Sequence, residues 1–434
     1  MAAAPSAADA GTTAAAAARR SYGKLVAFLA ARTRDVAGAE DALADAFAAA
    51  LAGWPERGIP DNPEAWLLTV ARRKLADAGR LRGQDNAAAD HFALLAELAD
   101  ADDGSELPDR RLGLLFACAH PGIDQAVRAP LMLQAVLGFD AATIASAFLV
   151  APSTMGQRLV RAKARIREAG IGFEVPGLPE LPARLEPVLE AIYAAYAEGW
   201  TDATGTDARR RNLSDEAIWL GRLLAALLPQ EPEALGLLAL MLHAHARRGA
   251  RRDGDGAYVP LAQQQTAQWD GAMIDEAEAV LWRASGFRRP GRYQLEAAIQ
   301  SAHNVRRHGG PPDWQAIAAL YEALHALTGS PVAAINRAVA MAATEGPQAG
   351  LAVLGALADD ARLSDYQPYW AARAELLARA GDGDEARAAY QRAIGLERDP
   401  AVRAFLQRQA AAVIGGADAG MQIPSSRKGS ASSS

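Results

Sequence analysis

Apolar residues recur at intervals of three or four along almost the whole chain, which is the spacing of a helix face that packs on a core. Runs of alternating β-branched residues, which would predict strands, do not occur. Ala, Leu, Arg and Glu dominate the periodic stretches, and all four are good helix formers. The pattern therefore predicts an all-α protein.

Composition predicts where the ordered segments begin and end. Residues 1–20 are rich in Ala, Ser and Thr, and residues 415–434 are rich in Gly and Ser, so both are predicted to be disordered tails. Every charged residue of 85–108 is acidic, which predicts a linker, and prolines at 176, 179 and 182 predict an extended spacer over 173–183. The domains expected between these segments are 21–84, 109–172 and a long extension divided into 184–310 and 311–414.

The helix predicted over 36–54 has two contrasting faces. Its apolar stripe is formed by Val36, Leu43, Phe47, Leu51 and Trp54. Its outer face carries Glu40, Asp41 and Asp45. On spacing alone, the ordinary interpretation is a solvated acidic face, and the alternative is a docking surface for a partner.

The next helix is predicted to begin at Asn62, with Asn as the N-cap and Pro63 in the first turn. Its buried stripe is expected to be Leu67, Val70, Ala71, Leu75 and Ala78. The opposite side carries Trp66, Thr69, Arg73 and Arg80, with Arg72 beside them. An aromatic side chain among arginines suits unpaired bases and phosphates, whereas the ordinary interpretation packs Trp66 between helices.

A third pattern predicts a helix-turn-helix. Asp140 is expected to cap a short helix that ends near Phe148, and a tight turn leads to a second helix from Ser153 to Glu168. The buried positions of the second helix are predicted to be Met155, Leu159, Ala162 and Ile166. Its other faces carry Ser153, Thr154, Gln157, Arg158, Arg161, Lys163, Arg165 and Arg167. Such a basic helix can enter the major groove of DNA.

Composition narrows the function classes. The chain has 434 residues and a net charge of -6, and its one cysteine, Cys118, excludes an internal disulfide framework. No apolar run approaches the roughly 18 residues of a membrane helix, so a cytoplasmic protein is expected. His243 and His245 point to different faces of a predicted helix and make no ligand pair. We expect no metal site, no cofactor and no enzymatic activity.

Three stretches, in this order, resemble bacterial RNA polymerase sigma factors of the extracytoplasmic-function class: GAEDALADAFAAAL (38–51), NPEAWLLTVARRKLADAGR (62–80) and APSTMGQRLVRAKARIREAG (151–170). The resemblance implies two small helical sigma domains that bind the clamp and flap regions of core RNA polymerase, and promoter DNA. It implies polymerase contacts by Glu40, Asp41, Asp45 and Phe47. It implies minus-ten contacts by Asn62, Trp66, Thr69, Arg72, Arg73 and Arg80, and minus-thirty-five contacts by Ser153, Thr154, Gln157, Arg158, Arg161 and Arg165.

The sequence departs from this family at two positions of the motifs. Ala44 replaces a glutamine common in the docking motif, and Gly156 stands where many relatives have a lysine. The extension resembles that of one subgroup, through 191–200, 215–251 and 293–303, whereas QQQTAQWD (263–270) departs from it. Trp370, Gly381, Ala386, Tyr390 and Ala393 fit a tetratricopeptide repeat, and Gly346 marks a weaker earlier copy. This resemblance implies a protein partner or an intramolecular contact for the extension.

Three functions remain open from the sequence. The first is a sigma factor whose extension regulates its activity. The second is a helix-turn-helix regulator with a tetratricopeptide sensor that acts without core polymerase, and the third is a helical scaffold whose basic helices are only solvated. The acidic face at Glu40–Asp45 and the helix of Trp66 favour the first, because a simple regulator needs neither.

Overall fold

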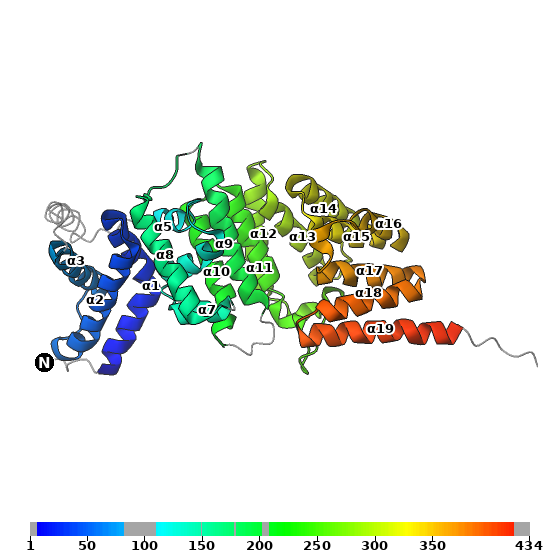
Figure 1. The fold of residues 1–434 in the computed structure, drawn as a ribbon, viewed down its shortest axis with the longest axis horizontal. Helices are drawn as coiled ribbons and strands as arrows, with labels where there is room; N and C mark the ends of the chain where they lie inside the picture. The colour runs from blue at the N-terminus through cyan, green and yellow to red at the C-terminus, as the bar shows by residue number, and fades with distance from the viewer. Residues whose placement is uncertain (1–6, 82–109, 149, 178, 202–207, 421–434) are drawn as a thin grey trace, which may run out of the picture. The chain divides into compact units, whose positions relative to one another are not determined.

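The computed structural model describes residues 7–81, 110–148, 150–177, 179–201 and 208–420 (Figure 1). Within these ranges the regular elements are helices, and an isolated bridge joins Arg252 to Tyr258. The predicted all-α fold is confirmed. The chain divides into two compact units, residues 1–227 and residues 228–434.

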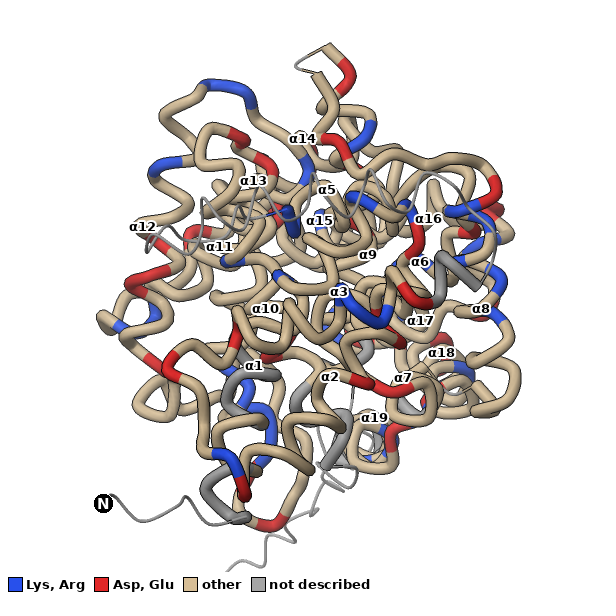
Figure 2. The backbone as a smooth tube through the Cα atoms, turned by 90° about the vertical axis from the view of Figure 1, so that its left-hand side faces the viewer, with Lys and Arg blue, Asp and Glu red and all other residues tan. Residues whose placement is uncertain are grey.

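The first unit contains two groups of helices followed by a covering pair. The helices are α1 (Ala7–Thr33), α2 (Val36–Arg57), α3 (Pro63–Leu81), α5 (Arg111–Cys118), α6 (Gln125–Leu137), α7 (Ala141–Ala147), α8 (Pro152–Glu168), α9 (Leu181–Thr201) and α10 (Ala208–Leu227). Figure 2 shows the acidic residues of α2 in red and the basic residues of α3 and α8 in blue. The predicted acidic linker, 85–108, lies outside the described residues.

Helix α1 is the centre of the first unit. Every residue from Leu25 to Ala30 is buried, so this part of α1 is covered on all sides and contacts α2, α3, α5 and α6. The prediction of a disordered tail over 1–20 is wrong from Ala7 onward, where α1 begins. Alanine has the highest helix propensity, and Ala14 is buried, so the alanine-rich stretch extends the helix instead of fraying.

The predicted spacer over 173–183 does not separate two domains. A Cβ at Gly113 of α5 would collide with the carbonyl of Phe173, so this segment packs directly on α5. Helix α9 begins inside the spacer, at Leu181, and Arg184 donates a hydrogen bond of 3.4 Å to the Phe116 carbonyl.

Helices α9 and α10 therefore belong to the first unit. Helix α9 packs on α5 and α6, and α10 packs on α7. The guanidinium of Arg111 lies 5.5 Å from the ring centroid of Trp219 in α10. The first compact unit ends at Leu227, well beyond the predicted start of the extension at residue 184.

The second unit is a series of paired helices. Its α-helices are α11 (Pro232–His245), α12 (Gly271–Gly286), α13 (Arg292–Asn304), α14 (Trp314–Thr328), α15 (Pro331–Thr344), α16 (Pro347–Ala356), α17 (Gln367–Ala380), α18 (Gly383–Leu396) and α19 (Pro400–Gly420). Because α19 continues to Gly420, the predicted disordered tail over 415–434 is wrong for residues 415–420. Residues 421–434 lie outside the described part of the chain.

The α17–α18 hairpin contains the residues that predicted a repeat. Gly381 ends α17 with φ 87°, a left-handed conformation that an L side chain rarely adopts. Ala386, Tyr390 and Ala393 are buried in one cluster, against which Trp370 packs. Gly346 occupies the turn of the α15–α16 pair with φ 94°, so the spacing of the two glycines corresponds to two helical hairpins.

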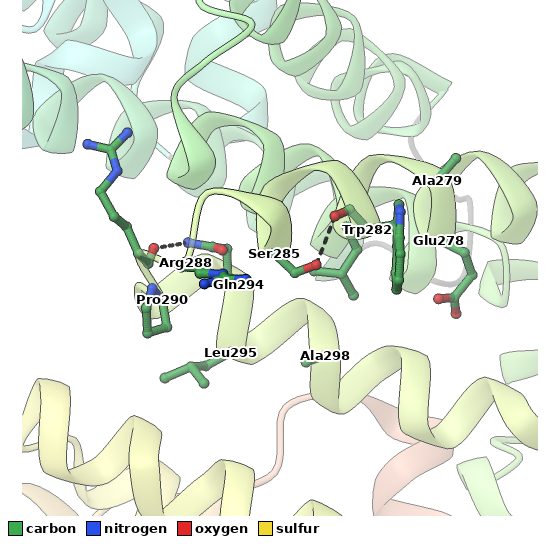
Figure 3. A pocket seen from close by; sticks show the side chains of 11 residues that line it. Glu278, Ala279, Trp282, Ser285, Arg288, Pro290, Gln294, Leu295 and Ala298 are labelled. Atoms are coloured by element: carbon green, nitrogen blue, oxygen red, sulfur yellow. Dashed lines mark hydrogen bonds between the residues drawn. The ribbon is translucent and has the colours of Figure 1, made fainter.

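A groove of about 680 Å³ lies between α12 and α13 (Figure 3). Ala279, Leu295 and Ala298 contribute apolar lining, and Trp282 stands beside it with 79% of its surface exposed. No sequence pattern indicated this exposed tryptophan, because its position looks like an ordinary position of an amphipathic helix.

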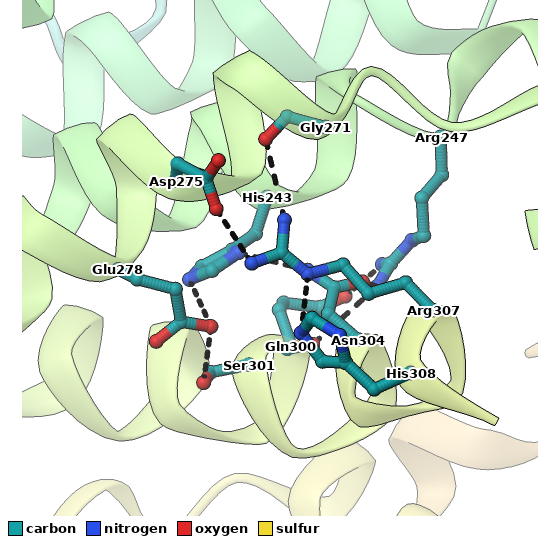
Figure 4. Close-up of polar contacts among 10 residues, drawn as sticks. All are labelled: His243, Arg247, Gly271, Asp275, Glu278, Gln300, Ser301, Asn304, Arg307 and His308. Carbon is teal, nitrogen blue, oxygen red and sulfur yellow. Dashed lines mark hydrogen bonds and ion pairs between the residues drawn. The ribbon is translucent and has the colours of Figure 1, made fainter. Parts of the chain in front are cut away.

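His243 lies at the centre of a buried polar network between α11 and α13 (Figure 4). Arg247 donates a hydrogen bond of 2.8 Å to Oδ1 of Asn304, which fixes the amide so that its Nδ2 donates to Nδ1 of His243, also at 2.8 Å. The Nε2 atom of His243 lies 3.8 Å from the Glu278 carboxylate, which accepts from Ser301. His243 is therefore a buried core residue whose Nδ1 atom is hydrogen-bonded and whose Nε2 atom has no hydrogen-bond partner among the described residues.

The network keeps His243 neutral. Burial lowers its pKa to about 3, and Arg247 and Arg307 add to the effect. His303 lies 5.5 Å from the Trp314 ring, and burial lowers its pKa to about 4. Both rings are neutral in the folded state at pH values where an unfolded histidine is already charged.

We expect a chain truncated after Leu227 to fold on its own, because the first compact unit ends there. A protein of residues 1–227 should keep its helical circular dichroism and unfold cooperatively. A protein of residues 1–172 should unfold at a clearly lower temperature, because losing α9 and α10 uncovers α5, α6 and α7. Equal midpoints for the two truncated proteins would contradict this division.

Acid should destabilise the second unit through its histidines. Each folded-state pKa lies below the unfolded value, so stability is full above about pH 6.5 and falls as the pH drops towards the folded values. At pH 5 the loss is about 2 kcal/mol for one such histidine. Urea unfolding at pH 7.5 and pH 5 should show a smaller difference, by about this amount, in His243→Gln than in the wild type. An unchanged difference would refute the buried neutral state of His243.

Candidate polymerase and DNA interfaces

The exposed side of α2 carries two of the acidic residues expected to face a partner. Asp41 and Asp45 are exposed, and Phe47 is half-buried. Leu51, expected in the buried stripe, is 52% exposed, so it joins this surface. Asp45 also lies 3.4 Å from Lys74 of α3 in an exposed ion pair, which contributes little stability. The surface combines acidic and apolar side chains, a composition suited to a protein partner.

Glu40 is not part of that exposed side, contrary to the prediction. Its residue is 8% exposed, and its Oε2 atom accepts a hydrogen bond of 2.6 Å from Nζ of Lys163 in α8. Burial raises the pKa of the Glu40 carboxyl, and the Lys163 ammonium acts in the opposite direction. The helical position of Glu40 is off the apolar stripe, but that face is covered by α8, which lies more than a hundred residues later.

Helix α3 begins as predicted, since the Asn62 side chain accepts a hydrogen bond of 3.1 Å from the Ala65 amide. Trp66 is half-buried and meets Trp54 of α2 edge to face, with 5.5 Å between ring centroids. The contact supports the packing interpretation, but part of the indole still faces solvent.

The remaining residues expected at the minus-ten element divide into exposed and buried positions. Arg73 is exposed, and Thr69 is half-buried with its hydroxyl bonded to the Ala65 carbonyl. Arg72 is only 4% exposed, so the prediction that it lies on the open face is wrong. It lies one helical turn after Leu68, which is fully buried, so it shares the buried face of α3. Arg80 lies in α3, but its side chain is outside the described part of the structure.

The α7–α8 pair has the predicted local structure. Asp140 caps α7 through a 2.8 Å hydrogen bond from the Thr143 amide, and a short turn leads to α8. The four predicted buried positions of α8 are confirmed: Met155, Leu159, Ala162 and Ile166. The positions between them are consequently turned outward or to the side.

Most of the α8 residues expected at the minus-thirty-five element are accessible. Ser153, Gln157, Arg161 and Arg165 are exposed, whereas Thr154 and Arg158 are half-buried. Val160, which the sequence did not single out, is 64% exposed among them. Gly156 has open space where a Cβ would lie, so nothing in the fold requires glycine there. The arrangement offers polar, cationic and apolar groups on one helix surface, as base and phosphate contacts require.

Two further residues of α8 form ion pairs on the α2 side, Lys163 in a buried position and Arg167 with about half of its side chain exposed. Lys163 binds Glu40, and Arg167 lies 3.7 Å from Asp35, which caps the start of α2. The sequence grouped both cations with the DNA-facing set, because charge alone does not reveal which face another domain covers.

Neither a metal centre nor a membrane segment is found in the part of the chain that the structure describes. No group of three or more His, Cys, Asp or Glu side chains there is arranged to hold an ion. No described helix is both long and apolar enough to span a bilayer. Cys118 is fully buried, and burial raises the pKa of its thiol.

Comparison with known proteins identifies two segments of the chain. Residues 18–86 match Sigma-70 region 2. The match includes α1 from residue 18 onward, α2 and α3. Residues 184–285 match a family of unknown function, DUF6596. No solved structure matches the chain.

A full-length relative gives the family. The uncharacterized protein R00370 of Rhizobium meliloti (strain 1021) is 41% identical over 377 residues, which are 86% of this chain and 89% of the relative. The chain therefore belongs to the protein family that includes R00370, and it contains a segment that matches Sigma-70 region 2.

Proposed function

We propose that this protein is a sigma factor of the extracytoplasmic-function class, which binds core RNA polymerase in the cytoplasm and directs promoter-specific initiation. One observation carries the proposal. A sigma-70 region 2 segment and a cation-rich helix after a tight turn, α8, occur in one compact unit. A protein with this pair of surfaces can hold polymerase and DNA together, and the bond-making chemistry then belongs to the polymerase.

The polymerase contact is assigned to the exposed side of α2. Asp41 and Asp45 supply charge, and Phe47 and Leu51 supply accessible apolar surface. Interfaces typically combine an apolar centre with a polar rim, which this helix side provides. Glu40 is left out of the assignment because its carboxylate is buried in an ion pair with Lys163.

The DNA contacts are assigned to two helices. Arg73 and the exposed part of Trp66 on α3 suit an opened minus-ten region, where cations meet phosphates and an indole can stack on a base. Gln157, Arg161 and Arg165 on α8 suit the major groove of the minus-thirty-five element.

The second unit is assigned a regulatory role, and its α15–α18 hairpins are assigned to the tetratricopeptide class. Support comes from the two turn glycines, the small buried residues of α18 and the room that such hairpins leave for a partner. The alternative is a helix-turn-helix regulator that acts without core polymerase. The region 2 match favours the sigma factor.

Run-off transcription with purified core polymerase and a library of genomic promoters tests the proposal. The full chain should direct initiation at a restricted set of promoters, and core alone should not. The chain of residues 1–227, assayed in parallel, tests the regulatory role, since equal output under all conditions would refute it. Binding to duplex DNA without any binding to core would establish the alternative regulator.

The exposed acids of α2 should matter for polymerase binding and little for folding. In Asp41→Lys/Asp45→Lys, binding to core should weaken at least tenfold, because two favourable charges become unfavourable at an interface. Glu56→Lys, at an exposed position near the end of α2, is the matched control. Binding can be measured by size-exclusion co-elution or fluorescence anisotropy, and wild-type affinity in the double variant would disprove the assignment.

Position 156 allows a gain-of-function test of α8. Gly156→Lys should strengthen duplex binding and steepen its salt dependence by about one unit, since it adds one phosphate contact. Gly156→Ala separates helix stabilisation, about 0.5–1 kcal/mol, from charge. Arg161→Ala should weaken binding, with a lower salt slope for a phosphate contact or relaxed specificity for a base contact. If neither charge change affects binding, α8 is not the DNA-reading helix.

A further inference from the structure

The groove between α12 and α13 lies within the second unit, and none of the assignments above uses it. Both helices supply its apolar walls, Ala279 and Leu281 from α12, and Leu295 and Ala298 from α13 (Figure 3). Trp282 lines the same groove, and at 79% it is the most exposed large apolar side chain in the part of the chain that the structure describes. An exposed tryptophan beside an apolar groove is typical of a surface that binds another protein.

Polar contacts hold the groove in shape. The Glu233 carboxylate of α11 caps the start of α13, because it accepts hydrogen bonds from the amides of Tyr293 at 2.9 Å and Gln294 at 3.2 Å. The Gln294 side chain donates a hydrogen bond of 2.7 Å to the Arg289 carbonyl, which ties the turn after α12 to α13. A Cβ at Gly291 would collide with the Glu233 side chain, so the fit between α11 and this turn is close. The groove is therefore formed before a ligand arrives, and binding requires little ordering of the protein.

Arg288 lines one end of the groove in an unfavourable backbone conformation. Its φ is 53°, in the left-handed region that glycine enters easily and other residues rarely adopt. Its side chain is exposed and takes part in none of the ion pairs found among the described residues, whereas Arg289 lies 3.7 Å from Glu231. Backbone strain at the edge of a pocket is characteristic of residues kept for binding. The position of Arg288 indicates a ligand with negative charge at this end.

The other end of the groove carries an acidic residue that already has partners. The Glu278 carboxylate accepts a hydrogen bond of 2.6 Å from Ser301 and lies 3.8 Å from Nε2 of His243. The available charge of the groove is therefore the cation of Arg288. Apolar walls with one accessible cation at the end complement an amphipathic segment that carries a carboxylate beside its apolar side chains.

Nucleic acid is a less suitable occupant of this groove. An indole and an arginine can serve bases and phosphates, but a strand also needs a continuous track of cations. Here Glu278 lies in the groove, and Glu231 and Glu233 lie beside it, so a phosphate backbone would meet like charges. Small apolar walls, by contrast, accommodate the apolar side chains of a helix.

We propose that the α12–α13 groove binds an acidic amphipathic helix of another protein. The apolar side chains of that helix lie in the groove against Trp282, and one of its carboxylates pairs with Arg288. The inference goes beyond the proposed function and does not depend on the polymerase and DNA assignments. Three independent features carry it: the exposed indole, the preformed apolar walls and the strained arginine.

Peptide selection on the full chain tests the ligand chemistry. A phage library of random peptides of about 16 residues, or about four helical turns, is selected on the immobilised protein. Recovered peptides are synthesised, and their affinities are measured by fluorescence anisotropy. They should carry apolar residues at intervals of three or four together with Asp or Glu. Trp282→Ala should weaken their binding at least tenfold, because it removes the largest apolar contact.

Arg288 permits a variant that separates binding from folding. Arg288→Gly relieves the left-handed strain, so the urea midpoint should be no lower than that of the wild type. Peptide affinity should nevertheless fall about fivefold and become less sensitive to salt, since one ion pair is lost. Arg288→Lys should keep most of the affinity. Arg283→Ala, which removes an exposed cation of α12 that does not line the groove, is the control and should change the affinity by less than about twofold.

Several results would overturn the proposal. They are peptides that bind Trp282→Ala or Arg288→Gly as tightly as the wild type, selected peptides rich in Lys and Arg, or the recovery of no peptide that depends on Trp282. Binding of oligothymidylate that is lost in Trp282→Ala would assign the groove to nucleic acid instead. A benzoylphenylalanine at the central apolar position of the peptide should cross-link to α12 or α13, and cross-links elsewhere would contradict the site without reliance on any variant. Polymerase takes no part in these measurements, so the groove and the proposed function can fail separately.

Discussion

Complete burial of α1 between Leu25 and Ala30 is the constraint on which the first unit depends. A helix that is apolar on all sides must be covered on all sides, and here α2 and α3 supply one part of the cover while α5 and α6 supply the other. The two groups of helices therefore share a core. Separating them would expose apolar surface such as Phe28, at roughly 25 cal/mol for each Å², so each group stabilises the other.

The pKa of Glu40 is a consequence of this shared core. Its carboxylate is buried because α8 closes over α2, and the cost of that burial appears as a raised pKa. Lys163 offsets the cost, so the pair is a condition of the contact between α2 and α8 and no general source of stability. Helical spacing placed Glu40 correctly off the apolar stripe. It could not predict a partner 123 residues away.

The sequence predicted what local physics determines. The buried face of α8, the cap at Asn62 and the all-α class follow from periodicity and capping, and the structure has them. Leu51 was expected to be buried and is exposed, whereas Arg72 was expected to be exposed and is buried. Burial at the edge of an apolar stripe depends on neighbouring helices, which the spacing does not show. Residues 7–20 were wrongly predicted to be disordered because their composition resembles that of a flexible segment. Alanine also propagates a helix, and the later residues of this helix are buried in a core.

The segment that matches a family of unknown function, 184–285, begins within one compact unit and ends in the other. Its first helices, α9 and α10, cover α5, α6 and α7, so they are as much part of the α5–α8 group as α8 itself. A bound partner can influence α8 only through elements that contact it or its neighbours. Helix α10 meets that condition, since it packs on α7 and continues directly into the second unit at Leu228. Two helices of the extension, α9 and α10, are thus part of the packing around the proposed DNA-reading pair, and α10 reaches α8 through α7.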